Sequence, residues 1–176
     1  MNLKIYQIDA FANRTFEGNP AAVCPLNEWI SDTLLQQIAA ENNLSETAFF
    51  VTEGNGFALR WFTPESEVDL CGHATLAAAH VIFKHLGYTN ESLLLNTKSG
   101  TLKVGRSDSG YSMSFPASHL EPVDTPVRLK EALGITPIKT LAAFDYIVIV
   151  ESQAQVQALS PDFATLQTLD LRGVVV

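Results

Sequence analysis

Residues 72–86, GHATLAAAHVIFKHL, form the stretch that decides the fold. The stretch is rich in Ala, has no internal breaker and is followed by Gly87, so it is predicted as one helix with Gly87 at its C-terminal end. Small or apolar residues cover most of the circumference of this helix, which is typical of burial nearly all round. A sheet that covers one face would not require such a helix, whereas a sheet that curls around it would.

Strand-like segments lie on both sides of this helix in the sequence. Alternating or β-prone residues predict strands at 3–9, 21–24, 47–52 and 57–62 before it, and at 92–96, 100–105 and 110–115 after it. Turns are predicted at 54–56 and 107–110, and Ser31 is expected to cap a helix that ends near residue 42. The prediction is an α+β fold in which a mostly antiparallel sheet curls around a central buried helix.

The residues after 120 follow a different pattern. Short helices are expected at 127–133, 152–159 and 161–167, with Ser160 as N-cap of the last one, and strands at 145–150 and from 173 onward. We therefore treat residues 1–120 and 121–176 as two parts of the chain.

Composition and charge exclude several classes of partner. Apolar residues make up 47% of the 176 residues, charged residues make up 17%, and the formal net charge is −8. An acidic chain without a basic run is poorly suited to nucleic acid or anionic membrane, so neither is expected as a partner. The N-terminal residues lack a signal-peptide pattern, no apolar run reaches a membrane span, and only two cysteines are present, so a soluble cytoplasmic protein with reduced thiols is expected.

Three segments depart from what a core requires. Glu46 precedes an apolar run, where desolvation of its charged form would favour general acid–base use, although a solvated loop Glu is the plainer alternative. Asn19 lies in Gly18-Asn19-Pro20, which a simple turn would also explain.

The third segment, Cys71-Gly72-His73, begins the buried helix. A helix N-terminus readily accepts a carboxylate or a developing oxyanion, Gly72 allows close approach to the backbone, and His73 can exchange a proton. The helix dipole is expected to favour the thiolate of Cys71. The alternative is a capped core helix whose His satisfies its own end, with Cys71 a small buried apolar residue.

Motifs for dinucleotides, for nucleotide phosphates and for a serine nucleophile are absent from the sequence. With two Cys and four scattered His, a structural zinc site is not expected, and no metal is assigned. His80, His85 and His119 are interpreted as packed or surface residues.

Taken in order, the motifs resemble those of the PhzF (phenazine biosynthesis-like) family. The resemblance covers residues 3–115 and is carried by four runs: Phe11-Ala12-Asn13, Phe16-x-Gly18-Asn19-Pro20-Ala21-Ala22-Val23, Asn43-Leu44-Ser45-Glu46-Thr47-Ala48-Phe49, and Arg60-Trp61-Phe62-Thr63-Pro64 through Glu67-Val68-Asp69-Leu70-Cys71-Gly72-His73-Ala74-Thr75. It implies the diaminopimelate-epimerase-like fold, with two similar lobes and the active site in the cleft between them.

The resemblance also implies an activity. It implies a cofactor-independent isomerase that acts by proton transfer on a small carboxylic acid, with the catalytic Glu at Glu46, the substrate-binding pair at Gly72 and His73, and Asn19 in a loop facing the cleft. A homodimer is also expected.

One departure from the family pattern concerns the second lobe. The family's second-lobe motif, of the Glu-Asp-Pro-x-Thr-Gly-Ser kind, is not found in these residues. We therefore expect residues 1–120 to form the first lobe, residues 121–176 to complete it and cross toward a second one, and the chain alone to carry half an active site and be inactive. Two alternatives stay open: a thiol-based racemase or epimerase that uses Cys71, and a non-catalytic single lobe that binds or self-associates.

Overall fold

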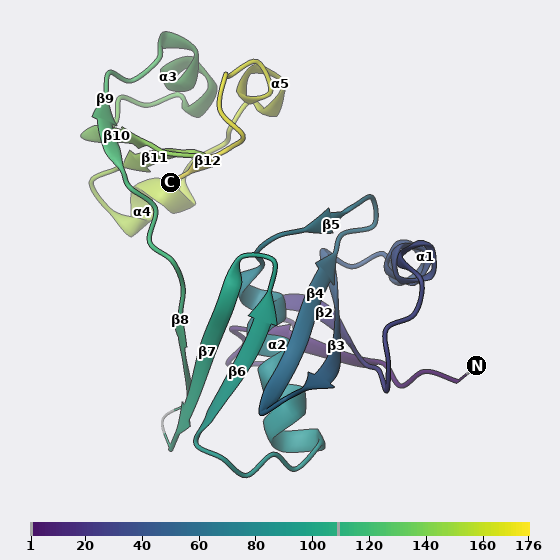
Figure 1. Ribbon diagram of the computed structural model, residues 1–176. Coiled ribbons are helices and arrows are strands. Elements are labelled where there is room, and N and C mark those ends of the chain that lie inside the picture. Colours follow the sequence, from purple (N-terminus) through teal and green to yellow (C-terminus); the bar gives the residue numbers. More distant parts are fainter. Residues whose placement is uncertain (1, 109) are drawn as a thin grey trace. The chain divides into compact units, whose positions relative to one another are not determined.

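The computed structural model describes residues 2–108 and 110–176, which form two compact units, one ending at Phe115 and one beginning at Pro116 (Figure 1). The turn predicted at 107–110 includes Ser109, which lies outside the described residues.

The first unit is built on a mixed β-sheet, with both parallel and antiparallel strand pairs. Its elements are β1 (Tyr6–Ala10), β2 (Asn19–Pro25), α1 (Asp32–Asn42), β3 (Glu46–Glu53), β4 (Gly56–Phe62), β5 (Glu67–Val68), α2 (Gly72–His80), the π-helix η1 (Val81–His85), β6 (Ser92–Thr97), β7 (Gly100–Ser107) and β8 (Gly110–Ser114). Among the described residues the strand order is β1-β2-β3-β4-β6-β7-β8, with β5 beside β4. The pairs β2–β3 and β4–β6 are parallel, and a helix lies in the connection of each, as a parallel pair requires. The other pairs are antiparallel. The predicted fold class, α+β with a mostly antiparallel sheet, is confirmed.

The predicted helix is buried on nearly every side. Within α2, Ala74, Ala77, Ala78 and Ala79 are fully buried, and their small side chains let the sheet approach the helix closely. At Val81 the helix changes to a π-helix, a change that the sequence pattern did not predict. Gly87 has a φ of +71° directly after the C-cap residue Leu86, as expected for a glycine that ends a helix.

Alternation along β3 divides the core between two helices. Ala48 and Phe50 pack in the cluster around α2, whereas Phe49 and Val51 pack on the other face with Leu35 of α1. Because side chains of a strand alternate between its faces, Glu46 belongs to the set that faces α2. Alternation along 57–62 likewise predicts one face for Leu59 and Trp61 and the other for Ala58 and Phe62, and these pack in the α2 and α1 clusters respectively.

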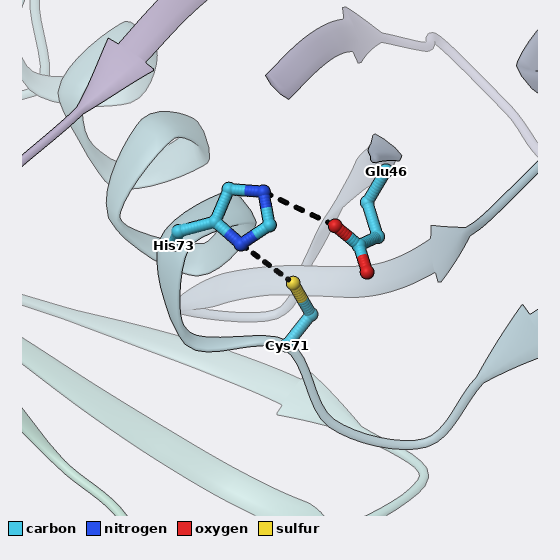
Figure 2. A group of neighbouring side chains, drawn as sticks. All are labelled: Glu46, Cys71 and His73. Carbon is cyan, nitrogen blue, oxygen red and sulfur yellow. Dashed lines mark hydrogen bonds and ion pairs between the residues drawn. The ribbon is translucent and has the colours of Figure 1, made fainter. Parts of the chain in front are cut away.

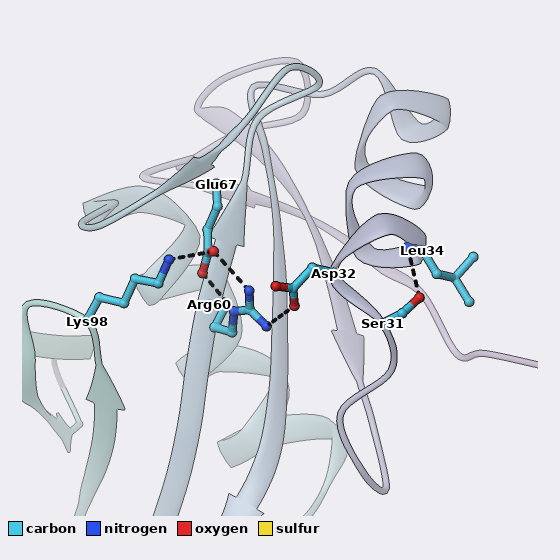
Figure 3. A network of polar contacts seen from close by, with 6 residues as sticks. All are labelled: Ser31, Asp32, Leu34, Arg60, Glu67 and Lys98. Atoms are coloured by element: carbon cyan, nitrogen blue, oxygen red, sulfur yellow. Dashed lines mark hydrogen bonds and ion pairs between the residues drawn. The ribbon is translucent and has the colours of Figure 1, made fainter.

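A charged network fixes the segment that leads into α2 (Figure 3). Arg60 of β4 donates two hydrogen bonds to the carboxylate of Glu67 in β5, at 2.7 and 2.9 Å, and a third to Asp32 of α1 at 2.8 Å. Lys98 donates to the same Glu67 carboxylate at 2.6 Å. The Arg60 guanidinium holds the pKa of Glu67 down to about 2. The short strand before α2 is thus held through Glu67 by Arg60 and Lys98, while Asp32 of α1 fixes Arg60.

The second unit has its own small sheet and core. Its elements are β9 (Glu121–Val123), α3 (Val127–Leu133), β10 (Lys139–Ala142), β11 (Tyr146–Ile149), α4 (Gln153–Gln157), α5 (Phe163–Leu166) and β12 (Val174–Val175). The strand order is β12-β11-β10-β9, and Leu129, Leu133, Tyr146 and Val148 form the core. Strands β9 and β10 were not predicted.

The N-cap predicted at Ser160 is wrong. The helix α5 begins two residues later, where the Asp162 carboxylate accepts hydrogen bonds from the backbone N–H groups of Ala164 and Thr165 at 3.0 and 3.3 Å. In residues 2–108 and 110–176, no helix combines the length and the apolar character that crossing a bilayer requires.

Candidate active site

Three polar side chains from two elements meet where β3 and α2 begin. Figure 2 shows the carboxylate of Glu46 close to one nitrogen of the His73 ring and the thiol of Cys71 close to the other. Glu46 and His73 are 27 positions apart in the sequence, so only the fold brings them together.

Local contacts fix the position of Glu46. Helix α1 ends at Asn43, which has a left-handed φ of +49° and turns the chain into β3. The Asn42 side chain donates to Oγ1 of Thr47 at 3.1 Å, and Thr47 is buried. Glu46 is therefore held by neighbours on both sides rather than lying in a solvated loop.

The helix N-terminus is equally well fixed. The carbonyl oxygen of Cys71 accepts hydrogen bonds from the backbone N–H of Thr75 at 3.1 Å and from its hydroxyl at 2.5 Å. Gly72 has open space beside it, since a Cβ built there would have its closest neighbour, Cζ of Phe115, at an ordinary 3.9 Å. The chain itself therefore leaves room for an atom next to the start of the helix.

Glu46 and His73 face each other without a formed hydrogen bond. Oε2 of Glu46 lies 3.1 Å from Nε2 of His73, and the two side chains are 19% and 12% exposed. Among the described residues, neither of these buried atoms has a hydrogen-bond partner. The two atoms therefore contact each other at ion-pair distance, although their geometry is not that of a hydrogen bond.

Cys71 differs from what its position on the helix suggested. Its Sγ lies 3.4 Å from Nδ1 of His73, and the residue is 7% exposed. Burial raises the pKa of the Cys71 thiol to about 12, and the nearby Glu46 carboxylate acts in the same direction, while the backbone N–H groups of Ala74 and His73 offset only part of the rise. The expectation of a favoured thiolate is wrong, because desolvation outweighs the helix dipole.

Asn19 joins the site through a neighbour. The Ser45 hydroxyl donates to Oδ1 of Asn19 at 3.2 Å, and Ser45 directly precedes Glu46. The pairing of Ala21 with Glu46 in the parallel β2–β3 ladder explains why the two segments lie side by side.

Ser45 and Thr47 lie in the predicted run around Glu46, but their hydrogen bonds were not predicted, and Phe115 was not predicted to lie near Gly72. Alternation along 110–115 places Phe115 on one face with Tyr111 and Met113, which pack against the core around α2.

A metal ion would not fit this cluster as it stands. One ligand atom each from Glu46, Cys71 and His73 lies within 4.8 Å of the others. The carboxylate and the thiol approach different ring nitrogens, however, so one ion held by all three would require the ring to turn.

The other histidines are packed or on the surface, as interpreted. Nδ1 of His80 lies 3.1 Å from the Tyr111 hydroxyl, His80 and His85 are in ring contact, and His119 is largely exposed beside Glu121.

The curled sheet around a buried helix, with a carboxylate facing a histidine at the helix N-terminus, defines a lobe of epimerase-like fold. The chain belongs to the phenazine biosynthesis-like (PhzC/PhzF) family, whose model matches residues 8–176.

Relatives and solved structures agree with this assignment. The chain is 52% identical over its whole length to a Pseudomonas aeruginosa protein named as an uncharacterized isomerase, and 41% identical to one of Halalkalibacterium halodurans with the same description; it covers 68% of each. A PhzF-family crystal structure from Enterococcus faecalis matches with a TM-score of 0.92 and 43% identity, over 97% of this chain and 66% of that one. A predicted epimerase of Pseudomonas aeruginosa, 21% identical with a TM-score of 0.70, shares the fold. The chain thus spans about two thirds of the length of these relatives.

Proposed function

We propose that this chain carries half of the active site of a cofactor-independent isomerase, in which Glu46 moves a proton on a small carboxylic acid. The facing of Glu46 Oε2 and His73 Nε2, both buried and both without a hydrogen bond in the described part of the chain, carries the proposal. The names of the two relatives as isomerases support the same class of reaction.

The geometry supports separate roles for the residues. Glu46 acts as base toward a carbon-bound proton and then as acid, because its carboxylate has lone pairs beyond the one that its contact with His73 uses. The Gly72 end of α2 receives the substrate's carboxylate, since backbone N–H groups and the helix dipole favour an anion there. His73 assists the transfer from beside Glu46, and Asn19 borders the site through Ser45.

The second acid–base group is proposed to come from the part of the family fold that this chain does not match. Glu46 can return the proton only where its carboxylate reaches, so delivery at a position or face beyond its reach needs a second group placed apart from it. The 176-residue chain is therefore expected to be inactive alone, and turnover by it would contradict the half-site proposal.

Exchange of substrate protons with deuterated solvent tests the role of Glu46. The native gene product is incubated in D₂O with a panel of small unsaturated or amino-acid-like carboxylic acids, and mass spectrometry detects incorporation. Glu46→Gln is expected to abolish the exchange. Glu53→Gln is the matched control, because Glu53 lies on the same strand but is exposed and bonded to Asn96. Unchanged exchange in Glu46→Gln would refute the role.

A thiol-based racemase is the second candidate, favoured by the 3.4 Å contact between Cys71 and His73. The raised pKa of the Cys71 thiol opposes it. Cys24, the other free thiol, lies in the cluster on the opposite face of the sheet and offers no partner thiol to this site. Loss of exchange after selective alkylation of Cys71 alone, with Glu46→Gln still active, would favour this candidate.

A further inference from the structure

We propose that Cys71 is a positioning residue for His73: its S–H donates to Nδ1 and thereby keeps the ring in the neutral tautomer that carries its proton on Nε2, toward Glu46. This inference rests on the proposed function of Glu46 as the acid–base group. It assigns to Cys71 no bond to substrate and no reaction of its own.

The sulfur is held in place to make this contact. Cys71 is 7% exposed, its carbonyl is fixed by two hydrogen bonds from Thr75, and its Sγ lies 3.4 Å from Nδ1 of His73. Burial raises the pKa of the thiol to about 12, so the sulfur keeps its proton. The thiol has one proton to donate and two acceptors beside it, the carboxylate of Glu46 and Nδ1 of His73. In our proposal this proton points toward Nδ1, where a neutral imidazole has its single acceptor nitrogen.

The contact at the second ring nitrogen, Nε2, selects the same tautomer. Nε2 of His73 lies 3.1 Å from Oε2 of Glu46. A lone pair on Nε2 at this distance from an ionised carboxylate would be repelled, whereas an N–H would be attracted. The thiol and the carboxylate therefore both favour a proton on Nε2 and a lone pair on Nδ1.

The chemical nature of the group at Nδ1 of His73 bears on where the proton taken from substrate is held. A carboxylate at Nδ1 stabilises an imidazolium and lets the histidine act as base. A neutral thiol at Nδ1 does not stabilise the imidazolium in this way, and the proposal keeps the proton taken from substrate on Glu46. The proton then stays on Glu46 and is available for return.

Nitrogen NMR of the protein with ¹⁵N-labelled histidine tests the tautomer directly. At alkaline pH, His73 is expected to show a protonated Nε2 and an unprotonated Nδ1. A protonated Nδ1, whether as the other tautomer or as imidazolium, would overturn the proposal even if no variant folds.

Variants test the cause. Cys71→Ala is expected to let both tautomers of His73 appear, while Cys71→Ser, which keeps a donor, retains the proton on Nε2. Cys24→Ala is the matched control, because it removes an equally buried thiol from the opposite face of the sheet and should leave the His73 signals unchanged. An unchanged tautomer in folded Cys71→Ala would refute the proposal.

Activity gives an independent measurement. In the native gene product, Cys71→Ala is expected to slow proton exchange by about tenfold, the effect of one hydrogen bond, through kcat rather than KM. Cys71→Ser is expected to keep most of the rate, and its inactivity in a folded protein would show that the sulfur itself reacts. Activity in Glu46→Gln would refute the proposed function instead, while the NMR result would stand.

Discussion

Replacing Gly72 by Ala separates two reasons for a glycine at the start of α2. A Cβ at this position meets its closest neighbour, Phe115 Cζ, at 3.9 Å, and Gly72 is not among the glycines with positive φ. The substitution therefore causes no strain and removes conformational freedom from the unfolded chain. We expect the free energy of unfolding to rise by about 0.5 kcal/mol.

The same methyl group would stand where the substrate is proposed to lie. A carboxylate bound to the first N–H groups of the helix approaches the backbone to about 3 Å, a distance that an added carbon obstructs. We expect Gly72→Ala to weaken substrate binding in the native gene product by about tenfold or more, equivalent to about 1.4 kcal/mol.

Denaturant unfolding and substrate titration of the same variant measure the two effects. Gly87→Ala is the control, because Gly87 also has open space but a φ of +71°, so Ala should cost about 1 kcal/mol there. Higher stability with lower affinity at Gly72 supports an approaching ligand. Unchanged affinity would refute the proposed position of the substrate's carboxylate. A loss of stability above about 1 kcal/mol would refute the inference that a methyl group fits at position 72 without strain.

Three further predictions concern stability. Arg60 lowers the pKa of Glu67 from 4.5 to about 2, and this shift corresponds to up to about 3 kcal/mol of folding stability. The stability is present above pH 4.5 and is lost as the pH falls toward 2. Urea unfolding should show Glu67→Gln less stable than wild type at neutral pH, with the difference in unfolding free energy closing in acid; a difference independent of pH would contradict this. Asn43→Ala should lower stability by about 1 kcal/mol because of the left-handed φ, while Asn43→Gly should not, and equal melting temperatures would exclude strain as the cause. Asp162→Ala should lower stability as loss of a helix cap and Ser160→Ala should leave it almost unchanged; the reverse order in urea unfolding would restore Ser160 as the cap.

The elements that the sequence predicted well are those whose signal is local. Alternation in 57–62 assigned the faces of β4, Ser31 accepts a hydrogen bond from the N–H of Leu34 as a cap should, and the composition of 72–86 predicted all-round burial. Strand β9, Glu121–Val123, was missed because it is short and contains a proline, and its strand character depends on pairing with β10.

The candidate site could be assembled from the sequence only in pieces. Glu46 and Cys71-Gly72-His73 were each singled out, but their contact depends on the parallel crossover that places β3 beside β2 and on the helix packed against that face. The bond between Ser45 and Asn19 depends on the same crossover. Parallel pairing between distant strands leaves little trace in local patterns, so neither contact was predictable from spacing.

The state of Cys71 shows how tertiary structure can reverse a conclusion drawn from local position. A helix N-terminus stabilises a nearby negative charge by about 0.3–1 kcal/mol. A rise in the pKa of the thiol from 9.0 to about 12 corresponds to about 4 kcal/mol against the charged form, so burial decides the outcome. A thiolate here would need a cation close by, whereas the Glu46 carboxylate beside the sulfur is of the wrong sign. Proton transfer at this site is therefore better assigned to the carboxylate, with the sulfur as a neutral hydrogen-bonding group beside the histidine.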